Sequence, residues 1–311
     1  MEFPKSFKEG LLDGDMLAFS SCAALEYGKD PEDVNWNDIA ENMAGRIQYM
    51  KRTLGIEKMR IFLTSDYNYR YDINSGYKAN RVESWRPYHL KNAKAYLKAM
   101  YDAEEVYGLE ADDLMSINQD TKNNTTVIIT LDKDLKQVPG CHFTWETQHH
   151  GEVRQIVTSL GHMEEIIKVS TSGTKKKEYK GSGFLFFMHQ CLVGDSTDGV
   201  LGCAVKEVVQ IKTGKKAGEF QEKRKGIGAK ESYLALKDCD TPNKAFQAVA
   251  KLYQAIFPPS QWKEMLLINA RSVHMLKQLP DDDGVITLWH YTKADEETSK
   301  FSLKNQAFLH G

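Results

Sequence analysis

The sequence has 311 residues, a formal net charge of −2, and 41% hydrophobic and 27% charged residues. These values exclude a disordered or fibrous chain, and the length allows one large core or one core with a smaller appended domain. A nearly neutral charge argues against a uniformly basic nucleic-acid binder, but it permits an acidic site rimmed by basic segments.

Nothing in the sequence predicts a membrane span or a secretory signal. The apolar runs hold only a few residues each, and the N-terminus lacks a basic-then-apolar layout. The five cysteines are odd in number and form no C-x-x-C pair, which indicates reduced thiols rather than disulfides or zinc ligands. We therefore expect a cytoplasmic protein without membrane contact.

Three apolar runs, each followed by an aspartate, are the predicted core strands. The runs lie at residues 11–12, 61–64 and 127–131, and the aspartates are Asp13, Asp66 and Asp132. Continuous apolar character favours strands buried on both faces, as in a parallel sheet. Each aspartate alone is compatible with a turn or a helix N-cap. Together they indicate a site at the carboxyl ends of the strands.

Helical spacing separates these strands. Apolar residues over 39–54 repeat at helical intervals before Gly55, and Pro87 is positioned to open a second helix. Alternating strands and helices predict an α/β domain with a mainly parallel central sheet flanked by helices.

The chain becomes helix-rich after about residue 184. The predicted helices begin near Phe184, at Pro242 after the N-cap Thr241, and near Trp262, the last running to Leu276. Two Lys-rich stretches, residues 170–183 and 211–228, are predicted to be loops.

Further carboxylates form three clusters. They are residues 110–113 (Glu-Ala-Asp-Asp), 132–134 (Asp-Lys-Asp) and 194–199 (Gly-Asp-Ser-Thr-Asp-Gly). Each cluster alone fits a turn or the first turn of a helix. Three carboxylates within four positions, however, repel one another unless cations neutralise them. Many carboxylates without His or Cys partners favour Mg²⁺ or Mn²⁺, and two such ions can promote phosphodiester hydrolysis.

Four segments occur in the order found in the flap-endonuclease superfamily. They are residues 77–81 (Tyr-Lys-Ala-Asn-Arg), 110–113, 130–134 (Thr-Leu-Asp-Lys-Asp) and 194–198. Over roughly residues 9 to 235 the chain resembles this superfamily, and within it the 5′→3′ exonucleases of short-tailed bacteriophages. The resemblance implies a PIN-like fold and hydrolysis near the 5′ ends of duplex or branched DNA, or of RNA in RNA–DNA hybrids.

The resemblance also implies which residues form the metal site. Its carboxylates would be Asp13, Asp66, Glu110, Asp112, Asp113, Asp132, Asp134, Asp195 and Asp198. In the family fold, one ion is served mainly by Asp13, Glu110, Asp112 and Asp132, and the second lies nearer Asp134, Asp195 and Asp198. The implied cofactors are two Mg²⁺ or Mn²⁺ ions.

The segment from Tyr77 to Arg81 matches the family's basic gateway. By resemblance, Lys78 and Arg81 face the scissile phosphate, where a point charge and a guanidinium fork stabilise developing charge. Tyr77 is expected to stack on a terminal base. The residues alone favour a solvated loop face.

Residues 226–230 (Gly-Ile-Gly-Ala-Lys) resemble the end of a helix–three-turn–helix element. There, backbone amides bind duplex phosphates, often with K⁺ on loop carbonyls, so we expect Gly226, Gly228 and Lys230 to bind nucleic acid. The family pattern is interrupted by a Lys-rich insert near residues 203–225, which fits a DNA-contacting segment and a solvated loop equally well.

We therefore expect two regions in one monomeric chain. Residues 1–190 would form the α/β nuclease core, with an arch or gateway near 67–106. Residues 191–311 would form a helical DNA-binding region that contains the modified helix–three-turn–helix element. A phage-encoded protein would act in the host cytoplasm.

Two other functions are compatible with parts of the sequence. In a haloacid-dehalogenase-type phosphatase, Asp13-Gly14-Asp15 would supply the nucleophile and acid, and residues 194–198 a metal motif. That reading leaves residues 77–81, 110–113 and 132–134 without roles. A non-catalytic nucleic-acid-binding protein of the same fold would be expected to have lost acidic ligands, and every placed position retains one.

Overall fold

The computed structural model describes residues 2–81, 84–147, 151–169, 173–214, 218–291 and 299–304. The chain divides into two compact units. The first comprises Met1–Tyr69, Glu83–Ser159 and Met275–Gly311, and the second comprises Arg70–Val82 and Leu160–His274. The expected boundary at residue 190 therefore differs from this division. The second unit begins earlier and also takes part of the predicted arch, while the C-terminal segment returns to the first unit.

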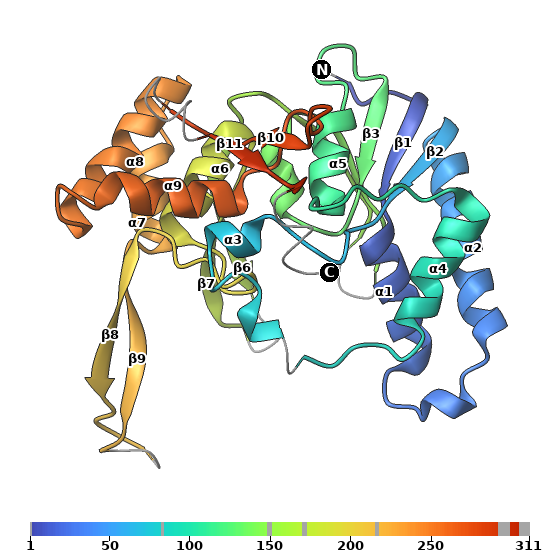
Figure 1. The fold of residues 1–311 in the computed structure, drawn as a ribbon, viewed down its shortest axis with the longest axis horizontal. Coiled ribbons are helices and arrows are strands. Elements are labelled where there is room, and N and C mark those ends of the chain that lie inside the picture. The colour runs from blue at the N-terminus through green and yellow to red at the C-terminus, as the bar shows by residue number, and fades with distance from the viewer. Residues whose placement is uncertain are drawn as a thin grey trace. The chain divides into compact units, whose positions relative to one another are not determined.

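A five-stranded sheet forms the centre of the first unit (Figure 1). Its strands are β1 (Phe7–Asp13), β2 (Ile56–Phe62), β3 (Thr126–Ile129), β4 (Gly140–Thr144) and β5 (Val153–Val157). The strand order is β2-β1-β3-β4-β5, and only β5 runs antiparallel to its neighbour. The predicted α/β fold with a mainly parallel sheet is confirmed. The carboxyl ends of β1, β2 and β3 consequently lie at one edge of the sheet.

Helices flank this sheet. They are α1 (Gly14–Glu26), α2 (Trp36–Thr53), α4 (Leu90–Tyr101) and α5 (Ala111–Asn118), with the 3₁₀ turns η1 (Pro31–Asp33) and η3 (Asp134–Gln137) and the short hairpin β10 (Val285–Thr287) and β11 (Lys300–Ser302). The helix predicted over residues 39–54 is confirmed, and Gly55 ends it with a φ of 56°. Pro87 precedes α4 by three residues instead of opening it, because the Leu90 N–H closes a turn onto the Pro87 carbonyl.

Alternation along the central strands divides the core into two layers. Leu12 and Ile129 pack into the main cluster with α1, α2 and α4. Leu11 and Ile128 are equally inaccessible but point to the opposite face, which α5 covers. Apolar residues are thus required on both faces, which explains the continuous runs in the sequence.

The second unit is mainly helical. It contains α3 (Arg70–Ile73), the 3₁₀ turn η2 (Ala79–Arg81), α6 (Gly183–Val193), α7 (Ala229–Leu236), α8 (Pro242–Ile256) and α9 (Trp262–Val273). The buried helix α6 packs against α7, α8 and α9. The Thr241 hydroxyl accepts the Lys244 N–H at 3.3 Å and caps α8 as predicted. No helix in the described residues of either unit is long and apolar enough to cross a membrane.

Two antiparallel hairpins complete the second unit and correct the loop predictions. They are β6 (His162–Val169) with β7 (Lys175–Ser182), and β8 (Ala204–Gln210) with β9 (Phe220–Gly226). Strands β7 and β9 fall within the stretches predicted to be loops. Their charged side chains lie on both faces, so the sequence shows no apolar alternation. Lys215 and Lys216 lie outside the described residues.

Candidate active site

The carboxyl end of β1 places Asp13 in the interior of the first unit, with 2% of its surface exposed. One carboxylate oxygen accepts the Met16 N–H at 2.9 Å and caps α1. The other accepts the Thr130 hydroxyl at 2.7 Å, at the end of β3. Asp13 therefore has the predicted position at the sheet edge and also serves as a helix cap.

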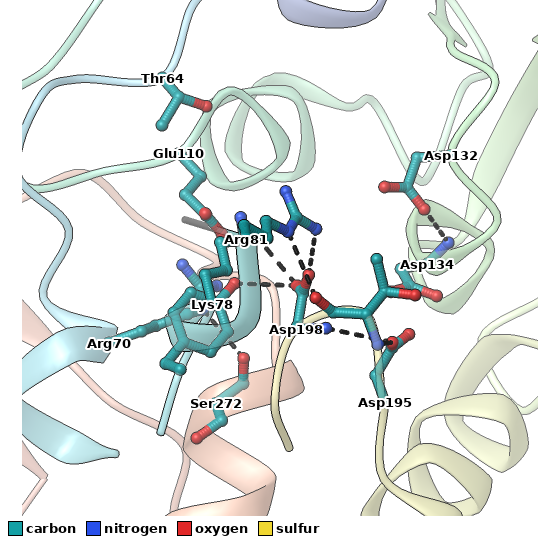
Figure 2. Close-up of polar contacts among 12 residues, drawn as sticks. Thr64, Arg70, Lys78, Arg81, Glu110, Asp132, Asp134, Asp195, Asp198 and Ser272 are labelled. Atoms are coloured by element: carbon teal, nitrogen blue, oxygen red, sulfur yellow. Dashed lines mark hydrogen bonds and ion pairs between the residues drawn. The ribbon is translucent and has the colours of Figure 1, made fainter. Parts of the chain in front are cut away.

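Thr130 connects Asp13 to the next acidic segment. The Asp132 N–H donates to the Thr130 hydroxyl oxygen at 2.9 Å. The Asp134 N–H donates to the Asp132 carboxylate at 2.8 Å (Figure 2). Both aspartates are half-buried. A single threonine thus links the carboxylates that follow β1 and β3.

Asp15 and Thr64 are not among the predicted metal ligands, but they contact each other at this edge of the sheet. The Asp15 carboxylate accepts the Thr64 N–H at 2.9 Å and pairs with the Lys94 ammonium. The Thr64 hydroxyl in turn accepts the Ala111 N–H at 3.1 Å. The end of β2 and the start of α5 are thereby connected to the start of α1. In the sequence, the position of Asp15 two residues after Asp13 is the one feature that indicates its place at this edge.

The carboxylates at this edge interact electrostatically. Burial, followed by the charge of Asp15 and more weakly that of Asp132, raises the pKa of Asp13 to about 7, although hydrogen bonds from Met16 and Thr130 oppose the shift. Such crowding disfavours several simultaneous negative charges unless a cation is present. The donor set consists of carboxylate oxygens, which are the ligands that hard divalent cations prefer.

The predicted acidic cluster at α5 divides into different roles. Glu110 is buried just before the helix and Asp112 is half-buried in its first turn. Asp113 is fully buried, and its carboxylate oxygens accept the Glu110 N–H at 3.3 Å and the Leu276 N–H at 3.0 Å. The structure gives Asp113 a role in capping α5 and anchoring the returning C-terminal segment, and its role as a metal ligand stays a prediction.

Lys277 supports this role of Asp113. Its ammonium donates to the Ser116 hydroxyl at 3.2 Å, and burial lowers its pKa to about 8 although the charge of Asp113 opposes the change. The buried Asp113 therefore faces backbone amides and a lysine that all belong to the fold of the first unit.

Asp113→Asn is expected to reduce the free energy of unfolding by about 3 kcal/mol, because two charge-assisted bonds and the attraction to Lys277 weaken in a buried position. Urea unfolding measures this loss. The matched variant Asp112→Asn, one residue away and half-buried, is expected to lower turnover with little change in stability. Equal stability of the wild type and Asp113→Asn would contradict the anchoring role.

Asp66 occupies a different environment from the other predicted ligands of the first unit. It lies at a bend four residues after β2 and is exposed. Thr64, two residues earlier, makes the connections to Asp15 and Ala111 that link β2 to the acidic edge. Thr64 therefore connects β2 to the acidic edge, and the role of Asp66 as a metal ligand stays a prediction.

In the second unit, the predicted basic gateway and the last acidic pair lie together (Figure 2). The Asp198 carboxylate pairs with the Arg81 guanidinium and lies 4.0 Å from the Lys78 ammonium. The Asp195 carboxylate accepts the Thr197 N–H at 2.7 Å and the Asp198 N–H at 3.3 Å, which closes the turn. The gateway cations therefore neutralise Asp198 within the same unit.

Backbone contacts hold this arrangement. The Lys78 N–H donates to the Asp198 carbonyl at 2.8 Å, and Lys78 adopts a φ of 53°. A non-glycine residue in this region costs roughly 1–3 kcal/mol, and such strain often occurs at functional sites. A Cβ atom on Gly199 would lie 2.1 Å from the Gly76 carbonyl oxygen, so this close approach requires glycine.

The placement of Tyr77 corrects a prediction. Only 4% of its surface is exposed, its hydroxyl donates to the Asp198 carboxylate at 3.2 Å, and the Lys78 ammonium lies 5.0 Å from its ring centre. A base cannot stack on a ring that is covered in this way. Tyr77 instead positions Asp198, a role available because tyrosine combines an apolar ring with a hydroxyl.

The predicted duplex-binding residues lie at the start of α7. The Gly228 N–H donates to the Glu231 carboxylate at 3.0 Å, and a Cβ atom on Gly228 would meet nothing within 4 Å. Lys230 is exposed, as nucleic-acid binding requires. Gly226 has a tighter environment: a Cβ atom there would lie 2.2 Å from the Cys203 carbonyl oxygen, so this glycine permits the strand pairing of β8 with β9.

Among the described residues, no group of three or more His, Cys, Asp or Glu side chains has the arrangement of a ligand shell. Several predicted ligands are held by the chain's own groups: Asp198 by Arg81, Asp113 by backbone amides, and Asp132 by the Asp134 N–H. At the acidic edge of the first unit, the carboxylate chemistry and the crowding of charge fit a hard divalent cation.

Sequence comparison places the chain near phage nucleases. No protein-family model matches it. It is 24% identical over 212 residues to the exodeoxyribonuclease of Enterobacteria phage T3, covering 62% of this chain and 61% of that protein. It is 25% identical over 213 residues to the exonuclease of Escherichia phage T7, covering 62% of each. The chain thus spans about three fifths of the length of these curated relatives, and the predicted resemblance to phage exonucleases is confirmed.

Solved structures from phage T5 are also similar. The T5 D15 protein crystallised with metal ions has a TM-score of 0.48 and 13% identity, covering 84% of this chain and 88% of that one. A D15 flap endonuclease complex with DNA and metal ions has a TM-score of 0.45 and 12% identity, covering 85% of this chain and 98% of that one.

Proposed function

We propose that the chain is a divalent-metal-dependent 5′ nuclease that hydrolyses phosphodiester bonds near the 5′ ends of duplex DNA. The observation that carries the proposal is the link from Asp13 through Thr130 to Asp132, which joins carboxylates at the ends of two parallel strands. The similarity to an exodeoxyribonuclease and an exonuclease supports the same reaction class.

The first unit supplies one group of proposed metal ligands. They are Asp13, Glu110, Asp112, Asp113, Asp132 and Asp134, with Asp66 as the remaining member implied by the resemblance. Two Mg²⁺ or Mn²⁺ ions bound by such carboxylates would supply a nucleophilic hydroxide and neutralise charge on the phosphate. Thr130 and Thr64 hold the ends of the strands at which these carboxylates lie. The assignment of Asp195 and Asp198 to the second ion rests on the resemblance.

Within the second unit, Lys78 and Arg81 are proposed to stabilise the scissile phosphate. The Arg81 guanidinium pairs with the Asp198 carboxylate in this structure, so a substrate phosphate would compete with that carboxylate for the guanidinium N–H groups. The Lys78 ammonium lies 4.0 Å from the Asp198 carboxylate and supplies a second positive charge beside it. Tyr77 would keep Asp198 in place during this exchange.

The proposed duplex-binding site lies at the start of α7. Backbone amides near Gly228 and the exposed Lys230 are suited to duplex phosphates, with Glu231 as the local competitor for the Gly228 N–H. We extend the proposal to branched DNA and RNA–DNA hybrids with 5′ ends, to K⁺ at this element, to a monomeric enzyme, and to action in the host cytoplasm.

Metal affinity is expected to rise with pH up to about 7. Asp13 must lose its proton to act as a ligand, and its pKa is raised to about 7 from the ordinary value of 3.8. The raised pKa stabilises the metal-free fold fully below pH 3.8, and this contribution is lost as pH rises to about 7. Calorimetric Mg²⁺ titrations between pH 5.5 and 8 should show proton release that disappears in Asp13→Asn.

A substrate comparison tests the proposed function. The full chain is incubated with Mg²⁺ and either a 5′-labelled duplex or a generic aryl phosphate, with EDTA as the control. The proposal predicts release of nucleotides from the duplex, no aryl-phosphate hydrolysis, and no reaction with EDTA. Hydrolysis of the aryl phosphate with intact DNA would replace the nuclease by a phosphatase, and DNA binding without cleavage in Mg²⁺ or Mn²⁺ would indicate a non-catalytic protein.

A further inference from the structure

The β8–β9 hairpin interrupts the predicted duplex-binding element without separating its two parts. The Ile227 N–H donates to the Cys203 carbonyl at 3.0 Å, and Ala204 pairs with Gly226 at the base of the hairpin. The two ends of the inserted hairpin are therefore adjacent, and the segment before the hairpin stays next to the segment that leads into α7.

Arg224 fixes the base of the hairpin. Its guanidinium donates to the carbonyl oxygens of Leu201 at 2.9 Å, Leu192 at 3.2 Å and Ile227 at 2.9 Å. These bonds connect β9 to the end of α6 and to the residue before Gly228. The hairpin therefore leaves the second unit in a defined direction, and Figure 1 shows it extending away from α7.

The sequence of the hairpin segment is basic although the whole chain is slightly acidic. Residues 204–226 contain seven lysine or arginine residues and three glutamates, in a chain of net charge −2. Two glutamates are paired across the strands, Glu222 with Lys206 at 3.1 Å and Glu207 with Lys225 at 2.8 Å. Lys212 and Lys223 are exposed, and neither forms an ion pair with a described residue.

Apolar side chains lie on the face of the hairpin opposite to that of Lys223. Val208 and Phe220 are 68% and 71% exposed. Their positions in the strand register are diagonal neighbours on one face of the hairpin. A two-stranded hairpin alone is only marginally stable in water, so a ligand that covers this face would stabilise it.

We propose that the β8–β9 hairpin is a second duplex-binding arm, which contacts double-stranded DNA beyond the stretch held at α7. The inference rests on the proposed function. Seven paired residues per strand span about 23 Å, or about seven base pairs at 3.4 Å each. A two-stranded ribbon fits the major groove, where exposed lysines meet phosphates and apolar side chains meet thymine methyl groups. Two apolar residues among charges are too small a patch for a stable protein interface, which needs about 800 Å² per partner.

Duplex length provides the test. Affinities for duplexes of about 8 and about 24 base pairs are measured by fluorescence anisotropy, with EDTA present to prevent hydrolysis. The wild type is expected to bind the longer duplex at least tenfold more tightly. Lys212→Glu combined with Lys223→Glu should remove most of this advantage and reduce the slope of log affinity against log salt by about 2. Binding and cleavage of the short duplex should change less than twofold.

Matched measurements separate the possible outcomes. Lys251→Glu, an exposed charge reversal on α8 in the same unit, should leave the length dependence intact. Hydrogen exchange of amides 205–214 and 218–225 should slow when the long duplex is added, and Phe220→Ser should weaken that protection. An unchanged dependence of affinity on duplex length in the double variant would contradict the proposed DNA-binding arm. Slowed amide exchange that depends on self-association of the protein and not on added DNA would also contradict it. Failure of the wild type to bind or cleave either duplex would instead reject the proposed function.

Discussion

Asp132→Asn is expected to lower turnover in Mg²⁺ by roughly a thousandfold while leaving substrate binding within a few fold of the wild type. Loss of a metal-ligand carboxylate removes several kcal/mol of transition-state stabilisation, and each 1.4 kcal/mol corresponds to a factor of ten. Asparagine retains an oxygen that can accept the Asp134 N–H, so the turn after β3 should persist. The change therefore isolates the negative charge from the local structure, and single-turnover kinetics on a 5′-labelled duplex measures its effect.

Asp120→Asn is the matched control for this variant. Asp120 also follows a core element of the first unit, and its carboxylate accepts the Lys122 and Asn123 N–H groups at 3.0 Å and the Thr125 hydroxyl at 2.6 Å. These bonds hold the pKa of Asp120 well below its usual range. This control should lose some stability and retain full turnover. Unimpaired turnover of Asp132→Asn would remove Asp132 from the proposed ligands.

Arg81→Ala is expected to reduce the maximal rate by about 10²–10³-fold, the usual effect of losing one donor that stabilises transition-state charge. Arg81→Lys should recover part of the rate, because lysine restores the charge without the guanidinium fork. Substrate affinity should change less than the rate, since most of the affinity comes from other backbone phosphates. Rates at saturating substrate, compared with equilibrium affinities, distinguish these effects.

Arg81 also contributes to the fold of the second unit, so a structural loss must be separated from a catalytic one. Its guanidinium contacts the Thr197 carbonyl at 3.3 Å and the Asp198 carboxylate. Thermal unfolding of each variant measures that contribution. Arg154→Ala removes an exposed ion pair between Arg154 of β5 and Glu152, which precedes the strand, and it is a control with no expected effect on rate. A rate for Arg81→Ala that equals the wild type would contradict the proposed role.

The sequence predicted the sheet and most helices because each of these elements is determined mainly by the pattern of residues within it and at its ends. The apolar runs before Asp13 and Asp132 identified buried parallel strands, and Thr241 before Pro242 identified the start of α8. The same patterns placed both aspartates at the carboxyl ends of strands. The hydroxyls of Thr130 and Thr64, which connect these ends, gave no periodic signal and were not anticipated.

Long-range contacts account for the predictions that differ from the structure. Asp113 carries the local pattern of a metal ligand, and it also accepts the Leu276 N–H, which comes from 163 positions later and has no local sequence signal. Tyr77 is buried because Asp198, 121 positions away, accepts its hydroxyl. The contact between their segments also assigns residues 70–82 to the second unit. A single sequence does not reveal which distant segments meet.

End-mapping of the products tests the central claim most directly. The wild-type chain is given a duplex labelled at the 5′ end and, separately, at the 3′ end of the same strand, in Mg²⁺ and after Mg²⁺ removal. Carboxylate-held ions acting at 5′ ends predict early release of short 5′-labelled products and a retained strand that begins with a 5′-phosphate, with no products once the metal is removed. Progressive shortening from the 3′ end, or equal cleavage without divalent metal, would contradict the account.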